Sequence, residues 1–177
     1  MILGLDISTS ITGATILDKD GNIIYNEAWG LKKHKDIFEK AYQVRQKLLD
    51  ICGKFHIKEI HIEKTLQTFR SGYSSAKTLS ILSSFNGMVS WLCYDIFVLK
   101  PEYIAASSAR KLCGIRVPRG QKAKSVVIQY ILDNVPSVTI EYTKHGNVKA
   151  ECYDKADSYI IAQSGYIKCQ REKNDKS

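Results

Sequence analysis

The sequence contains no C-x-x-C pair, although five cysteines (Cys52, Cys93, Cys113, Cys152 and Cys169) are spread over its 177 residues. A disulfide framework needs an even set of cysteines behind a secretory leader, and a zinc ribbon needs closely spaced pairs. Because neither pattern is present, we expect reduced thiols in an intracellular, cytoplasmic protein.

Long hydrophobic runs are also missing. Residues 79–99 are the only stretch of membrane-spanning length, and they are interrupted by several serines and by Asn86 and Asp95. Polar groups in such numbers are costly in lipid. The sequence therefore predicts a buried helix here and no membrane partner.

Acidic residues are fewer than basic ones. The chain has 18 of the former and 26 of the latter, which gives a net charge of +8 and a pI near 9.2. This surplus favours an anionic partner, nucleic acid before a membrane surface, over a merely basic surface. The length allows one domain, which we place at residues 1–168, ahead of a charged and disordered tail at 169–177.

The first ten residues, Met-Ile-Leu-Gly-Leu-Asp-Ile-Ser-Thr-Ser, set one carboxylate into an apolar run. Ile2, Leu3, Leu5 and Ile7 are typical of a strand that is buried on both faces. An ionised Asp6 in such a strand needs a cation or a hydrogen-bond donor nearby. It is either a metal ligand or a cap of the hydroxyl-rich turn that follows.

Strand-like and helix-like segments follow along the chain. An Asp-Gly turn between the apolar runs 12–17 and 22–29 predicts an antiparallel hairpin. The remaining pattern predicts helices over 35–55, 75–97, 107–113, 121–135 and 153–168, strands over 57–63 and 103–106, and a hairpin or flap inserted at 138–152. The mixture of elements predicts an α/β fold.

Three further acids are expected near Asp6. Glu63 ends a strand that returns after a helix, and such a strand usually lies parallel beside an earlier one; the alternative is a solvent-facing acid on an edge strand. Asp154 and Asp157 share a helical face with Ile161, which turns that face inward. The helix dipole, which favours acids in a first turn, accounts for one of them only.

Four acids at one place would repel one another unless divalent cations lay between them. Carboxylate oxygens are hard ligands, which suit Mg²⁺ or Mn²⁺. Without a histidine or cysteine cluster, zinc is disfavoured.

A basic stretch lies between the long helix and the flap. Six cations fall within fifteen residues of a segment broken by glycine and proline: Arg110, Lys111, Arg116, Arg119, Lys122 and Lys124. Such a cluster can contact DNA phosphates, although solvated basic loops are common.

The predicted helix at 75–97 is apolar on more than one side. Leu79, Leu82 and Phe85 form one stripe, and Ile81 and Trp91 lie around it. A helix of this kind needs more than one neighbour to cover it. Either it lies in the core or its second face pairs with another subunit, and the modest chain length favours the subunit.

Three motifs in order carry a resemblance to a known family. Ile-Leu-Gly-Leu-Asp-Ile-Ser-Thr-Ser-Ile-Thr-Gly at the start, Ile-His-Ile-Glu-Lys in the middle and Asp154-Lys-Ala-Asp157 near the end resemble the RuvC-type Holliday-junction resolvases of the ribonuclease-H-like superfamily. The resemblance covers roughly residues 1–168 and includes the segments Tyr-Ile-Ala-Ala-Ser-Ser-Ala-Arg-Lys and Lys-Ala-Lys-Ser.

The resemblance implies a five-stranded mixed sheet flanked by helices and a homodimer joined through the helix at about 75–97. It implies a structure-selective DNA endonuclease, a crossover-junction endodeoxyribonuclease, that resolves four-way junctions by paired nicks. Two Mg²⁺ ions about 3.5–4 Å apart, for which Mn²⁺ can substitute, would serve phosphodiester hydrolysis. The implied catalytic and metal-binding residues are Asp6, Glu63, Asp154 and Asp157, and Phe69, Arg70 and Lys155 join the six cations as expected DNA contacts.

The chain departs from the bacterial family in two places. That family carries a phenylalanine wedge three residues after the strand-end glutamate, where this chain has Leu66, with Phe69 nearby. The insertion at 138–152 has no counterpart in the compact bacterial enzymes. The sequence looks more like a viral or phage branch, which would act in the host cytoplasm. A broader fork or flap nuclease, a non-catalytic nucleic-acid-binding protein of the same fold and an actin-like ATP phosphotransferase are the alternative functions.

Overall fold

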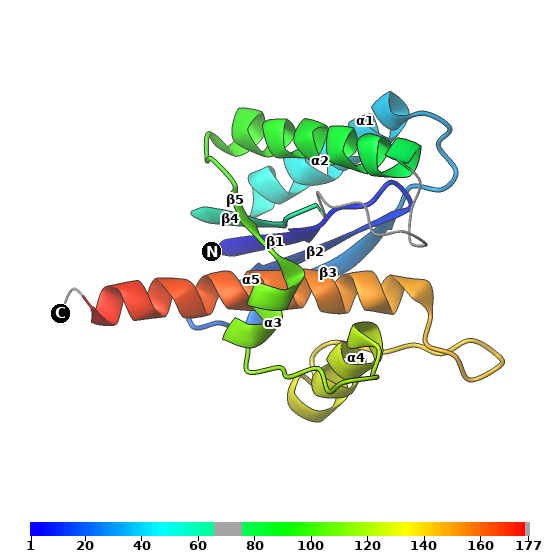
Figure 1. Ribbon diagram of the computed structural model, residues 1–177. Coiled ribbons are helices and arrows are strands. Elements are labelled where there is room, and N and C mark those ends of the chain that lie inside the picture. The colour runs from blue at the N-terminus through cyan, green and yellow to red at the C-terminus, as the bar shows by residue number, and fades with distance from the viewer. Residues whose placement is uncertain (66–75, 176–177) are drawn as a thin grey trace.

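The computed structural model describes residues 1–65 and 76–175. Five strands form one sheet in the order β3-β2-β1-β4-β5 (Figure 1): β1 Ile2–Asp6, β2 Ile11–Leu17, β3 Ile23–Gly30, β4 Glu59–Glu63 and β5 Glu102–Ile104. β2 is antiparallel to β1 and to β3, whereas β1, β4 and β5 run parallel. The expected mixed sheet is therefore confirmed.

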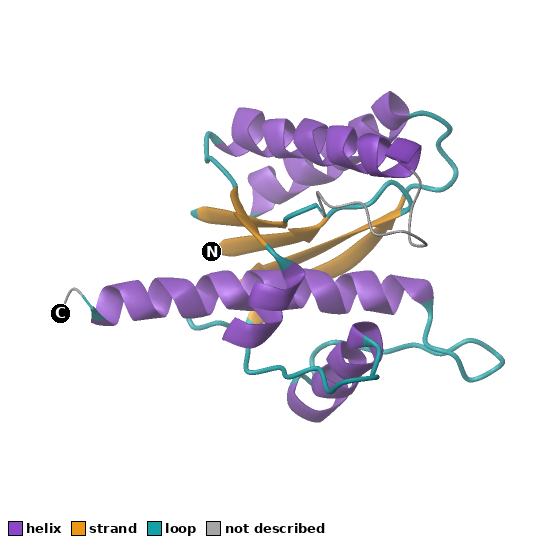
Figure 2. Ribbon diagram, in the orientation of Figure 1, coloured by secondary structure: helices purple, strands orange, loops and turns teal. Residues whose placement is uncertain are grey.

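Helices cover both faces of this sheet (Figure 2). α1 (Ile37–Lys54) and α2 (Ala76–Phe97) lie on one face, and α3 (Ala106–Leu112), α4 (Ala123–Asn134) and α5 (Ala150–Asn174) lie on the other. Each face has its own buried core: Leu5, Val44, Leu48, Phe85 and Val89 belong to the first, and Leu17, Ile131, Ala156, Ile160 and Ile161 to the second. The strands between them are therefore apolar on both sides, as the continuous run in β1 predicts.

The structure has a cap and a turn at two places where the sequence predicts that a helix begins or a hairpin turns. α1 begins after Asp36, whose carboxylate accepts two backbone N–H bonds from the first turn. The hairpin between β2 and β3 turns at Gly21, which has a positive φ of 84°. The Asp18 carboxylate accepts two backbone N–H bonds of the same turn.

The last helix differs from the prediction. The sequence predicts a helix over 153–168 and a disordered tail over 169–177, but α5 extends from Ala150 to Asn174. The Lys168 ammonium donates to Glu102 at 2.6 Å, and the Cys169 thiol donates to Glu59 at the same distance. These contacts with β4 and β5 hold the extension on the sheet, so composition alone was misleading for 169–174.

The predicted insertion is shorter than the sequence suggested. Residues 150–152 belong to α5, and the hairpin has one isolated β-bridge, between Tyr142 and Val148. In Figure 1 this loop projects from the molecule beside the N-terminal end of α5. Within residues 1–65 and 76–175, no helix has the length and hydropathy that a membrane crossing requires.

Candidate active site

The pairing of β1 with its neighbours brings the first two acids together. β1 runs parallel to β4 with Leu5 opposite Ile62, so Asp6 and Glu63 end adjacent strands at the same edge of the sheet. Asp6 directly follows Leu5, and Glu63 directly follows Ile62. The prediction that Glu63 returns beside Asp6 is therefore confirmed, and both side chains are half-buried.

A glycine in β2 allows the third acid, Asp154, to lie at the same edge of the sheet. Gly13 lies opposite Asp6 in the antiparallel β1–β2 pair. A Cβ atom at Gly13 would overlap the backbone carbonyl of Asp154, so β2 and α5 touch backbone to backbone there. This contact places the turn of α5 that carries Asp154 directly against the strand pair that carries Asp6.

A buried polar network fixes the rotation of α5 about its axis. The hydroxyls of Thr15 and Ser158 lie 2.8 Å apart, and Asn26 donates from its amide both to Thr15 and to the Lys155 carbonyl, at 2.7 and 3.1 Å. Ser158 follows Asp157 directly, so the network holds the acidic turn. Sequence reasoning missed these three residues, although a threonine in the middle of a buried strand was a signal.

The fourth acid lies one turn along the same helix. Asp157 is half-buried, and Ile161, four residues later, is only 1% exposed. The inward orientation predicted for this face is therefore confirmed. Asp6, Glu63, Asp154 and Asp157 come from β1, β4 and α5 and converge on one edge of the sheet.

Burial and mutual repulsion hold the protons of these acids more tightly than usual. Desolvation, followed by the charges of Glu63, Asp157 and Asp154, raises the pKa of Asp6 well above its ordinary value. Desolvation and then Asp157 raise the pKa of Glu63 to about 7. Desolvation is also the main cause that raises the pKa of Asp154 to about 6 and that of Asp157 above its usual range.

Two cations from the predicted basic stretch reach this cluster. The charge of Lys124 opposes the pKa rise of all four acids, and the charge of Arg110 opposes that of Glu63 and Asp157. Lys124 lies on α4, with its ammonium 5.5 Å from the centre of the Tyr153 ring. The basic stretch and the acids therefore belong to one site, which the spacing along the chain did not reveal.

The donor set of this cluster fits a hard divalent cation. All four side chains are carboxylates; burial is the first cause of their raised pKa values, and for Asp6, Glu63 and Asp154 neighbouring carboxylates add a repulsion that a cation between them would relieve. In the described part of the chain, no three or more His, Cys, Asp and Glu side chains form a ready-made metal cage. Mg²⁺ typically takes only one or two protein carboxylates per ion and completes its shell with water and substrate phosphate, so such a cage is not required.

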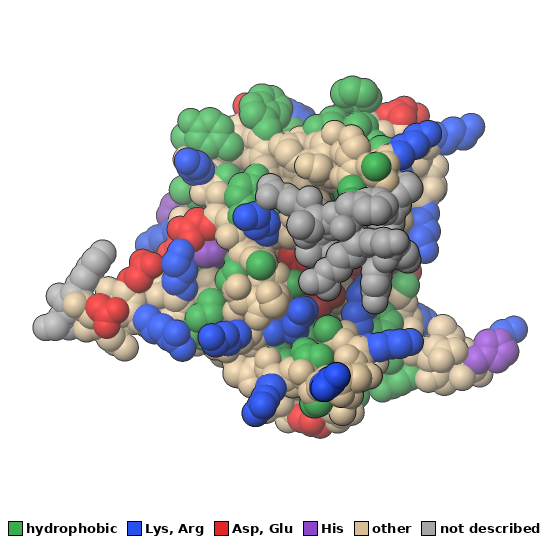
Figure 3. Space-filling view, viewed as in Figure 1, with side chains coloured by type: hydrophobic (Ala, Val, Ile, Leu, Met, Phe, Trp, Pro, Cys, Tyr) green, Lys and Arg blue, Asp and Glu red, His purple; other side chains and the backbone are tan. Residues whose placement is uncertain are grey.

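The other expected DNA contacts differ in their exposure and in the elements that carry them. Lys111, Arg116, Arg119 and Lys122 are exposed on α3 and on the loop before α4, whereas Lys155 is half-buried on α5. Figure 3 shows acidic atoms recessed on this face of the molecule, with basic side chains on the surface below them. Phe69, Arg70 and Leu66 lie outside the described residues.

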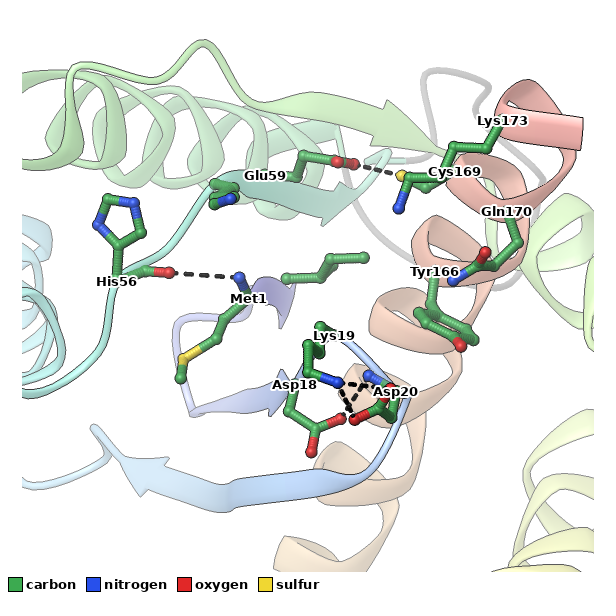
Figure 4. A pocket seen from close by; sticks show the side chains of 12 residues that line it. Met1, Asp18, Lys19, Asp20, His56, Glu59, Tyr166, Cys169, Gln170 and Lys173 are labelled. Atoms are coloured by element: carbon green, nitrogen blue, oxygen red, sulfur yellow. Dashed lines mark hydrogen bonds and ion pairs between the residues drawn. The ribbon is translucent and has the colours of Figure 1, made fainter. Parts of the chain in front are cut away.

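A separate hollow of about 460 Å³ opens at the other end of the sheet (Figure 4). Polar groups along it pair with one another: the Lys19 ammonium pairs with the Asp20 carboxylate, and the Glu59 carboxylate accepts a hydrogen bond from the Cys169 thiol. The start of β1 lines this hollow, whereas Asp6 lies at the end of that strand. It therefore belongs to a different part of the molecule from the acid cluster.

The sheet order and the helices on both faces match the ribonuclease-H-like fold of RuvC structures. The chain resembles Thermus thermophilus RuvC in complex with a Holliday junction substrate, with a TM-score of 0.68 at 12% identity over 96% of this chain and 94% of that one. A second structure of Thermus thermophilus RuvC gives 0.61 at 13% over 97% and 96%. The yeast mitochondrial Holliday junction resolvase gives 0.59 at 15% over 99% and 83%.

No protein-family model matches the chain, and no curated protein matches it. The likeness is therefore one of fold, over nearly the whole length of these structures. It confirms the fold that the resemblance of the motifs implied.

The raised pKa of Glu63 gives a testable pH dependence in metal-free buffer. The folded protein binds a proton on Glu63 more readily than the unfolded chain does. Ionised Glu63 therefore lowers the free energy of unfolding by its full amount above pH 7, and this destabilisation decreases as the pH falls toward 4.5. Glu63→Gln should therefore raise the free energy of unfolding by about 1–3 kcal/mol at pH 8. The gain should vanish near pH 4.5.

Urea unfolding of wild type and variant in chelator, at several pH values, measures this difference. Equal stabilities at pH 8, or a gain that grows as the pH falls, would contradict the electrostatic account. We expect added Mg²⁺ to stabilise the wild type more than the variant, which lacks one of the four carboxylates.

Proposed function

We propose that this protein is a divalent-metal-dependent DNA endonuclease that resolves four-way junctions by paired nicks. The observation that carries the proposal is the convergence of Asp6, Glu63, Asp154 and Asp157, from three elements distant in sequence, at one edge of the sheet. The fold shared with resolvase structures supports this substrate class.

In this proposal Asp6 and Glu63 hold metal from the strand side, and Asp154 and Asp157 hold it from the helix side. Bound Mg²⁺ lowers the pKa of an attacking water and neutralises charge on the leaving oxygen of a phosphodiester. The acids are half-buried, and the Gly13 contact and the Thr15–Ser158 pair hold α5 in place against β2.

The direct test uses synthetic DNA. A four-way junction, a Y-fork and a linear duplex of the same sequence are each incubated with the protein, with Mg²⁺ and with chelator. We expect symmetric nicks in the junction with Mg²⁺ only. Equal cutting of the fork would favour the broader branched-DNA nuclease, and junction binding without any cutting would favour a non-catalytic binding protein.

We also propose that the basic side chains around α4 follow the DNA backbone without reading bases. Lys122→Ala should weaken junction binding and lower the slope of log K against log salt by about 0.9, the value for one phosphate contact. Lys19→Ala is the matched control, because Lys19 lies on the β2–β3 hairpin, where it pairs with Asp20. An unchanged slope for Lys122→Ala would show that this surface faces away from DNA.

A second copy of the chain is the partner we propose for the outer face of α2. Trp91 and Tyr94 are 61% and 53% exposed there, and Gly87 faces open space in the middle of the helix. A mid-helix glycine costs roughly 1 kcal/mol relative to alanine. The close approach of a helix from a second copy would account for a glycine at this position.

Trp91→Glu should therefore convert a dimer to a monomer, since it places a charge in the centre of the proposed contact. Sedimentation velocity at micromolar concentration measures the change. Leu132→Glu, at an exposed apolar position on α4, is the control and should leave the mass unaltered. A wild type that sediments as a monomer would refute the homodimer and leave the nuclease proposal standing.

A further inference from the structure

A buried amide on α2 reaches the end of β4. Asn86 is only 7% exposed, and its side-chain nitrogen donates to the backbone carbonyl of Glu63 at 3.2 Å. The hydroxyl of Ser90, one turn further along, donates to the backbone carbonyl of Asn86 at 2.7 Å. The residues that flank them, Phe85 and Val89, are fully buried. A polar side chain at such a place is costly unless it is hydrogen-bonded, so the contact with Glu63 accounts for the amide.

The carbonyl that Asn86 contacts belongs to the peptide group between Glu63 and Lys64. The N–H at the other end of this peptide, on Lys64, donates to the backbone carbonyl of Ile104 at 2.8 Å. One rigid plane is therefore held on one side by α2 and on the other by β5. This plane sets the last backbone dihedral angle of Glu63, and so the direction in which its carboxylate leaves the strand.

We propose that Asn86 is a positioning residue for Glu63, which acts through this peptide and not through contact with metal or DNA. The inference rests on the proposed function, because it assigns Asn86 to the same site. Loss of the amide frees one end of the peptide plane. The Glu63 carboxylate then samples a wider range of positions at the edge of the sheet, and metal binding and cleavage both weaken.

The test compares Asn86→Leu, which keeps the approximate size of the side chain and removes the donor, with Ser90→Ala. The control removes a buried hydroxyl from the same face of α2, which also lies 3.5 Å from the Asn86 side-chain oxygen, and leaves the nitrogen that donates to Glu63 in place. We expect Asn86→Leu to lower the single-turnover cleavage rate of a four-way junction by about 10- to 100-fold, the usual effect of a small displacement of a reacting group. Junction affinity measured in Ca²⁺ should stay within about twofold of wild type.

A second readout does not depend on cleavage. The rise in melting temperature that Mg²⁺ gives the wild type should need a several-fold higher Mg²⁺ concentration in Asn86→Leu, but not in Ser90→Ala. A role in packing alone would lower the melting temperature of the metal-free protein and leave this Mg²⁺ dependence unchanged. Asn86→Ala, which removes the donor and adds no charge, serves if the leucine variant does not fold.

Cleavage and Mg²⁺ dependence equal to those of Ser90→Ala would overturn the inference. A wild type that cuts no branched DNA would overturn the proposed function instead, while the Mg²⁺ melting curves would still test the positioning role.

Discussion

Asp6→Asn is expected to abolish Mg²⁺-dependent nicking of a four-way junction, with a loss of at least about 10³-fold, or ~4 kcal/mol of transition-state stabilisation. Asp6 lies close to the other three acids: after burial, the charges of Glu63, Asp157 and Asp154 each raise its pKa. An amide in its place cannot supply the charge that holds a cation between them. Single-turnover cleavage of a labelled junction measures the effect.

Junction binding should survive this change, because the cations that we propose to contact phosphates lie on other elements. In metal-free buffer the variant should melt at a higher temperature than the wild type, since one of four repelling charges is gone. Asp20→Asn, on the hairpin at the opposite end of β2, is the control and should cut normally. Cleavage by Asp6→Asn at the wild-type rate would remove the proposed active site.

Gly13→Ala is expected to have the second large effect, and on stability as well as activity. The new methyl group would overlap the backbone carbonyl of Asp154, and backbone cannot rotate aside as a side chain can. Overpacking of this kind costs about 1–3 kcal/mol or more. The displacement of α5 away from β2 should also lower cleavage, because it moves Asp154 and Asp157 away from Asp6.

Gly30→Ala is the matched control, since Gly30 is also a strand glycine of this sheet, at the end of β3, but a Cβ atom there meets nothing within 4 Å. It should leave both the urea midpoint and the cleavage rate unchanged. If Gly13→Ala is as stable and as active as Gly30→Ala, the close contact between β2 and α5 does not position the acids.

The sequence predicted the parts of this site that leave a periodic signal. An apolar run with one acid marked β1, and the spacing of Asp154, Asp157 and Ile161 marked an inward helical face. It could not predict which cations approach the acids. Lys124 and Arg110 looked no different from Lys122 or Arg119, because their selection depends on how α3 and α4 fold back against α5.

Other failures have a shared physical cause. Gly13, Asn26 and Asn86 make contacts between elements that are distant along the chain, and such contacts leave no periodic pattern in the sequence. The prediction of disorder was wrong for residues 169–174 for the same reason, since Lys168 and Cys169 find their partners only once β4 and β5 lie beside α5.

The length of α5 links the two ends of the molecule. This one helix of 25 residues begins beside the acids and ends beside the hollow that contains Glu59 and Cys169. At 1.5 Å per residue it is a rod of roughly 37 Å. Removal of the last turns of α5, or oxidation of Cys169, would therefore weaken the packing of this helix against the sheet. Because Asp154 and Asp157 lie near its other end, such a change would also alter the proposed cleavage site.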